Sequence, residues 1–185
     1  MSLLNRLRNV FIQGDYAGRD MVKNVLPKPT QLDHLSKAYK NEVTGKQLTF
    51  EFIDELLHYK TKKKERRDLA KKLFDAGLSE HLEDAEELKE LITKLIMKYQ
   101  HYNSAQKIIT LLLAEVESIF NVEIKPKLHP QITMVEVKAL IRTCIEIEIS
   151  EKLGENVLEI YNRQINGMVF YLTGNCHLEW DDASL

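Results

Sequence analysis

Residue types that could carry chemistry gather near the C-terminus, where Cys176 and His177 are neighbours. Three acids follow them, namely Glu179, Asp181 and Asp182. A structural zinc site usually takes paired cysteines or histidines from two segments, but the other cysteine and the other histidines are scattered singly. A thiol nucleophile needs a third group that orients its base, and the sequence identifies none. The spacing therefore predicts neither a metal site nor a catalytic cysteine.

Acidic residues also repeat along one predicted helix, at Glu83, Glu86, Glu87 and Glu90. A di-iron bundle needs the Glu-x-x-His pattern on two helices, and this chain has it once, at Glu55 and His58. We predict a solvent-facing acidic stripe instead. The sequence also contains no Gly-rich phosphate loop ending in Lys and Ser or Thr, and no serine in a nucleophile elbow. We therefore expect no catalytic residue, no cofactor and no metal, in a protein that is not an enzyme.

The most basic stretch runs from Lys60 to Arg67. Such a run is typical of a patch for nucleic acid or for an acidic partner, which leaves a nucleic-acid-binding regulator as the alternative function. No aromatic residue interleaves the run, and the formal net charge of the chain is −2. With this net charge, no overall electrostatic field would draw the protein to nucleic acid. We therefore favour reading the basic run as a solvated junction between helices, and we expect no nucleic-acid partner.

The composition favours one helical domain. Hydrophobic residues make up 44% of the 185 residues, with only 7 Gly and 4 Pro, which leaves long uninterrupted periodic stretches. These predict an all-α fold, a single bundle of about six or seven helices, with a helix rich in apolar residues from Ile108 to Phe120 at its centre. Two cysteines and no stretch long enough to span a bilayer predict a cytoplasmic protein without a membrane partner.

Capping residues predict where the helices begin and end. Gly45, Gly77, Gly154 and Gly174 end helices; Thr49, Ser79, Ser104 and Thr133 start them, the last with Glu136 in a capping box. Between Ile145 and Ile149, apolar and acidic residues alternate as in a strand. We predict a helix there, because the cap and the 3.6-residue spacing outweigh a short alternation.

Residues 1–28 differ from the helical domain that we assign to residues 29–185. Gly and Asp recur in them and favour turns, so this part is either a flexible tail or short extended pieces around tight turns. The recurring residues are Gly14, Asp15, Gly18 and Asp20, which we predict as a second contact element.

The segment from Tyr161 to Trp180 concentrates amides, aromatic residues and the only Trp. A glycine inside a helix costs about 1 kcal/mol relative to alanine, so Gly167 indicates the close approach of another backbone. A packed interface between subunits and an ordinary core helix with a capped end both fit these residues. The predicted contact residues are Tyr161, Asn166, Gly167, Tyr171, Asn175, His177 and Trp180.

These motifs together resemble the C-terminal module of bacterial ABC-three-component conflict systems, over residues from about Val10 to Asp182. The resemblance rests on Gly-Asp-x-x-Gly-Arg-Asp at 14–20, on Leu-Gly-Glu-Asn at 153–156, and on the closing Tyr, Ile-Asn-Gly-Met, Tyr-Leu-Thr-Gly-Asn-Cys-His and Trp at 161–180. It implies a helical module that dimerises and joins an effector to an SMC-like ABC ATPase, in systems thought to sense phages or plasmids. An effector domain usually precedes the module, whereas this chain starts directly at the Gly-Asp segment. Either the effector is a separate protein or this chain is an adaptor version of the module. In both cases we predict a non-enzymatic scaffold that forms a homodimer and recruits the ATPase.

Overall fold

The computed structural model describes residues 29–61 and 67–180, and these fold into helices without a strand. A π-helical segment, Ile141–Glu146, joins α6 and α7 into one continuous rod. With that rod counted once, the described residues form seven α-helices, which confirms the predicted all-α bundle. The Gly/Asp-rich segment lies outside the described residues. In chain order the helices are α1 (Gln31–Gly45), α2 (Asp54–Lys60), α3 (Leu69–Asp75), α4 (Leu82–Tyr99), α5 (Asn103–Ile119), α6 (Met134–Leu140), α7 (Ile147–Lys152) and α8 (Asn162–Gly174).

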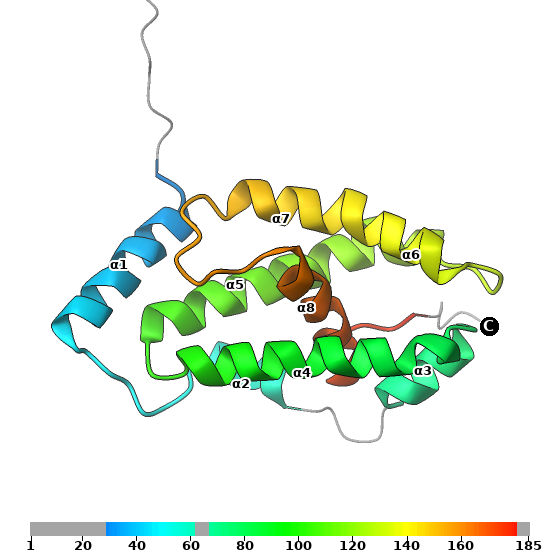
Figure 1. The fold of residues 1–185 in the computed structure, drawn as a ribbon, viewed down its shortest axis with the longest axis horizontal. Coiled ribbons are helices and arrows are strands. Elements are labelled where there is room, and N and C mark those ends of the chain that lie inside the picture. Colours follow the sequence, from blue (N-terminus) through cyan, green and yellow to red (C-terminus); the bar gives the residue numbers. More distant parts are fainter. Residues whose placement is uncertain (1–28, 62–66, 181–185) are drawn as a thin grey trace, which may run out of the picture.

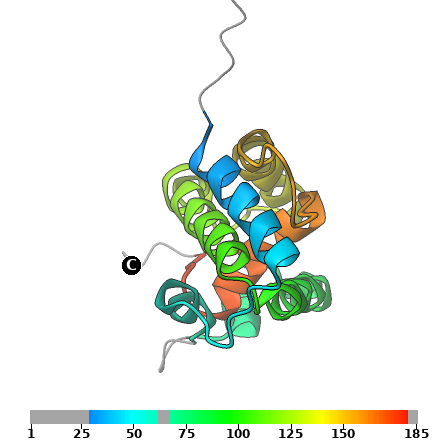
Figure 2. The ribbon, with the colours of Figure 1, turned by 90° about the vertical axis from the view of Figure 1, so that its left-hand side faces the viewer.

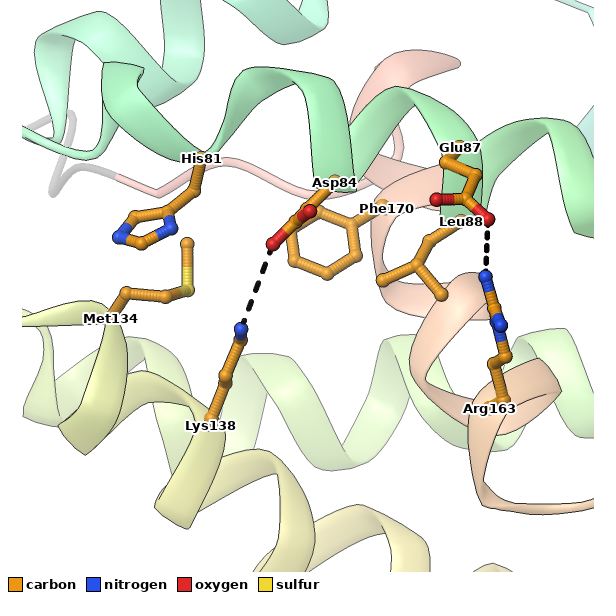
Figure 3. Close-up of a pocket in the computed structure, with 8 residues that line it drawn as sticks. All are labelled: His81, Asp84, Glu87, Leu88, Met134, Lys138, Arg163 and Phe170. Carbon is orange, nitrogen blue, oxygen red and sulfur yellow. Dashed lines mark hydrogen bonds and ion pairs between the residues drawn. The ribbon is translucent and has the colours of Figure 1, made fainter.

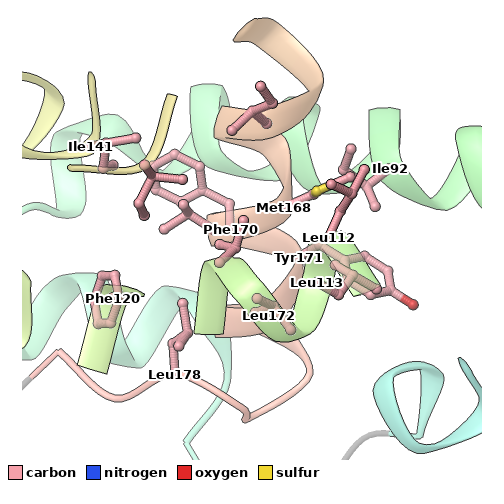
Figure 4. Packing of buried hydrophobic residues seen from close by; sticks show 14 of the residues in the cluster. Ile92, Leu112, Leu113, Phe120, Ile141, Met168, Phe170, Tyr171, Leu172 and Leu178 are labelled. Carbon is pink, nitrogen blue, oxygen red and sulfur yellow. The ribbon is translucent and has the colours of Figure 1, made fainter. Parts of the chain in front are cut away.

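Helix α8 lies at the centre of the bundle, between the α6–α7 rod and α4 (Figure 1). It packs mainly against α4, while α1 lies along α5, as the side view also shows (Figure 2). Helix α5, which the sequence predicts as central and buried against several neighbours, contacts α1, α2, α4 and α8 and has nine buried residues. The core between these helices contains large apolar side chains from α4, α5 and α8, including Ile92, Leu112, Leu113, Met168 and Leu172 (Figure 4).

The predicted helix ends are confirmed where the signal is local. Thr133 and Glu136 form the capping box at α6, in which the Thr133 N–H donates to Glu136 Oε2 at 2.8 Å. Gly77 and Gly154 follow helices with φ of +71° and +53°, a left-handed backbone that glycine adopts without strain. Helix ends that are capped by residues nearby in the chain can therefore be predicted from this sequence.

Two predicted caps are wrong, and both residues are bound instead by groups far away in the sequence. Helix α2 begins at Asp54, and Thr49 lies in the preceding loop, where its N–H donates to the carbonyl of His101 at 2.9 Å. Ser104 lies inside the first turn of α5, and its N–H and hydroxyl both donate to the Glu42 carboxylate of α1. The cap of α5 is thus supplied by another helix, which no local pattern reveals.

The alternating segment is helical, as predicted. Ile145 and Ile149 are one turn apart and fully buried, whereas Ile147 is half-exposed on the opposite side of the rod. None of the described helices combines the length and apolar character that crossing a bilayer requires.

Candidate interaction face

Most of the predicted contact residues lie in the core of their own chain. Of the seven C-terminal residues, Tyr161 is exposed and Asn166 is half-buried, while the other five are buried. The structure thus places Tyr161 at the N-cap of α8 and the other six within α8 or in the segment that follows it, with five of the seven turned inward. The predicted residues Gly14, Asp15, Gly18 and Asp20 lie outside the described residues.

Gly167 permits the close backbone approach that the sequence predicts, and its neighbour is α4 of the same chain. A Cβ atom at this position would lie 2.7 Å from the carbonyl oxygen of Leu88 and 2.9 Å from Cγ1 of Ile92. Real Cβ atoms do not approach so closely, so no other residue fits here without moving α8 or α4. Gly167 therefore sets the distance between the two helices.

Residues 175–180, which we call the C-terminal strap, return from α8 across the bundle. The Asn175 side-chain amide donates to the carbonyl of Tyr59 at 3.0 Å, and the His177 ring lies 5.0 Å from the Tyr59 ring. The Trp180 ring stacks on Phe170 at 6.1 Å. Asn175, His177 and Trp180 of the strap thus all contact residues of their own chain.

Lys72 of α3 binds the strap, and its side chain has no exposed surface. Its ammonium donates to the carbonyl oxygens of Thr173 at 3.1 Å and Leu178 at 2.7 Å, and lies 3.1 Å from Glu179 Oε1. A buried ammonium is tolerated only when its donors are satisfied, so this lysine and the strap require each other. Sequence reasoning missed Lys72, because a single lysine beside Lys71 gives no sign of burial.

The Cys176–His177 pair also has a structural place in the strap. Cys176 is fully buried with φ of +65°, and its thiol donates to the carbonyl of Arg67 at 3.4 Å. Glu179 is turned toward Arg67 and Lys72, with Arg67 Nη2 3.1 Å from Glu179 Oε2. The described residues contain no group of three or more His, Cys, Asp or Glu arranged to hold a metal ion, and Asp181 and Asp182 lie outside them.

Asn166 joins α8 to the rod through a buried carboxylate. Its amide nitrogen donates to Glu146 Oε1 at 3.0 Å, while its own oxygen has no hydrogen-bond partner among the described residues. Burial raises the pKa of Glu146, against the opposing effects of Arg142 and of the hydrogen bond from Asn166. The charged form of Glu146 is therefore costly in the folded state.

Replacing Glu146 with glutamine should raise the free energy of unfolding at neutral pH by about 0.5–1 kcal/mol, because a neutral amide avoids that cost and can donate to the Asn166 oxygen. A raised folded-state pKa means that the wild-type residue stabilises the fold below its ordinary pKa and loses this contribution as the pH rises through the folded value. Urea unfolding at neutral pH and below about pH 4 measures the difference, which should vanish in acid. The exposed Glu151→Gln is the control, and an equal effect from it would contradict the assignment.

Two hollows lie on one side of α4 and α8, and we call this side the α4–α8 face. The first lies between α4, α6 and α8, has a volume of about 160 Å³, and has an apolar floor of Leu88, Met134 and Phe170 (Figure 3). Two ion pairs border it, Asp84 with Lys138 at 3.9 Å and Glu87 with Arg163. All four charged side chains are more than half exposed, so each pair contributes little to stability and is free to exchange partners.

The second hollow lies farther along α4, beside the segment that leads into α8. It has a volume of about 440 Å³ and contains the half-buried Leu91 and the exposed Tyr161, with Lys94 and Lys98 at its border. Of the predicted contact residues, only Tyr161 belongs to this lining. The signal that sequence reasoning missed is that the charges along α4 change sign after Glu90, from acidic to basic.

The remaining predictions concern charged stretches. The stripe of Glu83, Glu86, Glu87 and Glu90 is solvent-exposed, as predicted. Of the basic run, residues 62–66 lie outside the described residues. At its two ends, the Lys60 ammonium lies 3.0 Å from the centroid of the Phe52 ring, and Arg67 pairs with Asp75 at 2.9 Å. A nucleic-acid role for this run stays a prediction, and its described ends have partners within the chain.

Comparison with known proteins gives one match. The model of a family described as C-terminal domain 9 of the ABC-three component (ABC-3C) systems matches residues 68–180, more than half of the chain. Neither a search of curated proteins nor a search of solved structures found a match. The matched range includes the closing motif up to Trp180 and excludes the Gly-Asp segment, so it is shorter than the range over which the sequence shows its resemblance.

Proposed function

Because the chain belongs to the family of C-terminal domain 9 of the ABC-three component systems, we propose that it is a non-enzymatic interaction module. In this proposal it forms a homodimer and joins a separate effector to an SMC-like ABC ATPase, within a bacterial defence against phages or plasmids. The nucleic-acid-binding regulator is the weaker alternative, since no described contact favours it.

The observation that carries the proposal is the α4–α8 face. Its first hollow, at about 160 Å³, is smaller than the roughly 300–1,000 Å³ of sites for small molecules, whereas the second, at about 440 Å³, is within that range and is bordered by the exposed Lys94 and Lys98. An apolar floor with exposed charged borders instead suits the side chains of another protein, as in the polar rim and apolar centre of protein interfaces. The burial of Cys176 in the strap further supports a role without a thiol nucleophile.

The predicted contact residues take two different roles in this proposal. Tyr161, with 63% of its surface exposed, contacts the partner directly. Gly167, Tyr171, Asn175, His177 and Trp180 instead hold α8 in place behind the face, since all five are buried in their own chain.

The experiment has two parts, self-association and capture of the ATPase. Light scattering over a dilution series should give a mass near twice 21.5 kDa, and the tagged chain should retain the ABC ATPase encoded in the same system. Arg163→Glu on the α4–α8 face should weaken at least one association by about tenfold, because it reverses the charge of an exposed side chain at the border of the first hollow. The control is Lys107→Glu, an exposed residue of α5, which should change neither. A monomer at every concentration that also fails to retain the ATPase would contradict the proposal.

A further inference from the structure

Helix α4 presents one exposed stripe whose charge reverses along its length. The stripe begins with Glu83, Glu87 and Glu90 and continues with Lys94 and Lys98, at spacings of three or four residues that place them on one side of a helix. All five side chains are exposed. The 18 residues of α4 make a helix about 27 Å long, along which the three acids extend over about 10 Å and the two lysines over about 6 Å.

The contacts that these charges make within the chain are weak ones. Lys94 pairs with Glu90 at 2.9 Å, Lys98 pairs with Glu159 at 3.5 Å, and Glu87 pairs with Arg163. The side chains in all three pairs are more than half exposed, and exposed pairs contribute at most about 1 kcal/mol. Each lysine can therefore exchange its present partner for a carboxylate on another surface.

The order of the charges fits a copy of the same helix running in the opposite direction. Glu87 and Lys94 are equally far from the midpoint between Glu90 and Leu91, and so are Glu83 and Lys98. A twofold axis through that midpoint would place Glu87 opposite Lys94 and Glu83 opposite Lys98, twice over. A parallel arrangement would place acid against acid and lysine against lysine, so only the antiparallel one is favourable.

Apolar groups lie where such a contact would need them. Leu91 is half-buried next to the midpoint of the stripe, and Met97 exposes 49% of its surface near the basic end. The hollow of about 440 Å³ opens beside Leu91 and has Tyr161 in its lining, which leaves room for a side chain of the second copy.

We propose that two copies of this chain associate through antiparallel α4 helices, with the acidic half of each stripe against the basic half of the other. A second copy fits this surface because one helix carries both the charges and their complement in mirrored order, which a twofold interface requires. The proposal rests on the proposed function only for the existence of a homodimer, to which it assigns a surface.

Two charge-reversed variants test this arrangement, each measured alone and in an equimolar mixture by light scattering. The first, Lys94→Glu with Lys98→Glu, makes the stripe wholly acidic; the second, Glu83→Lys with Glu87→Lys, makes most of it basic. Each alone should dimerise at least about tenfold more weakly than the wild-type chain, because like charges then face each other. Their mixture should recover a dimer that contains one copy of each. The control, Lys37→Glu with Lys107→Glu, changes the net charge by the same amount at exposed positions of α1 and α5 and should dimerise like the wild-type chain.

The outcomes of this experiment distinguish an error in the α4 surface from an error in the proposed function. If both variants stay dimeric alone, the α4 surface is wrong, while the homodimer of the proposed function stands. If both are monomeric and their mixture stays monomeric, antiparallel pairing is overturned. A wild-type chain that is monomeric throughout would overturn this proposal together with the dimeric part of the proposed function, whereas its link to the ATPase would be judged by capture alone.

Discussion

Replacing Lys72 with methionine should lower the free energy of unfolding by about 3 kcal/mol or more. Methionine keeps the apolar stem but leaves the carbonyl oxygen of Leu178 without its donor. It also removes one of two donors to the Thr173 carbonyl, which keeps the Cys176 N–H, and one of two positive charges beside Glu179, which keeps Arg67. A buried acceptor that loses its partner costs about 1–3 kcal/mol, and hydrogen bonds to a charged group contribute about 1.5–3 kcal/mol each. Urea unfolding followed by the fluorescence of Trp180, the only tryptophan, measures the loss.

The adjacent Lys71 provides the matched control for this prediction. It lies in the same helix and is exposed, so Lys71→Met should change the free energy of unfolding by no more than about 0.5 kcal/mol. If the two substitutions had equal effects, the role of Lys72 in holding the strap would be refuted. An increase in stability with Lys72→Met would show instead that desolvation of the ammonium outweighs its contacts.

Gly167→Ala should destabilise the fold by about 2–3 kcal/mol, because one added methyl group overpacks the contact between α8 and α4. The gain in helix propensity of about 1 kcal/mol does not offset this, since the nearest atom is the carbonyl oxygen of Leu88, at 2.7 Å, and belongs to backbone. Thermal unfolding followed by circular dichroism should show a lower midpoint with unchanged helix content below the transition.

Gly174 in the same helix separates this packing effect from the general effect of glycine. A Cβ there would lie 2.8 Å from Cδ of Lys89, part of a flexible side chain that is free to move away. Gly174→Ala should therefore change the free energy of unfolding by less than about 1 kcal/mol. Equal losses at both positions would mean that the short distance at Gly167 has no special importance. The same steric argument makes Gly167→Leu unsuitable as a probe of subunit contacts, because it would disrupt the folded monomer.

Local patterns in this sequence predict local structure well. Hydrophobic periodicity predicted the helical bundle, and the Thr133–Glu136 box and Gly154 predicted two ends of the long rod. These succeed because the interacting groups are three or four residues apart in the chain. Thr49 and Ser104 were wrong as caps for the opposite reason, since the groups that bind them come from His101 and Glu42.

At the interaction face, too, the sequence indicated features of single residues but not the distant residues that they contact. Gly167 correctly indicated a close approach, but the sequence did not tell whether the neighbour was α4 or another subunit. Amides and aromatic residues look alike in a core and in an interface, because both settings need buried polar groups with partners. The residues that border the two hollows, such as Lys94 and Arg163, gave no signal as single charges. Only the position of α4 against α8 brings them onto one face.

The C-terminal strap has a consequence for the synthesis of this protein. Lys72 and the Thr173 carbonyl are 101 residues apart in the chain, and Trp180 closes over Phe120. During translation, α3 and α4 leave the ribosome long before the residues that cover them, so their apolar sides stay open to chaperones or to neighbouring nascent chains. Contacts so far apart in sequence also form slowly. A polypeptide that carries this domain therefore completes its core only once Trp180 has emerged, and association through α4 before that moment would involve an unfinished protein.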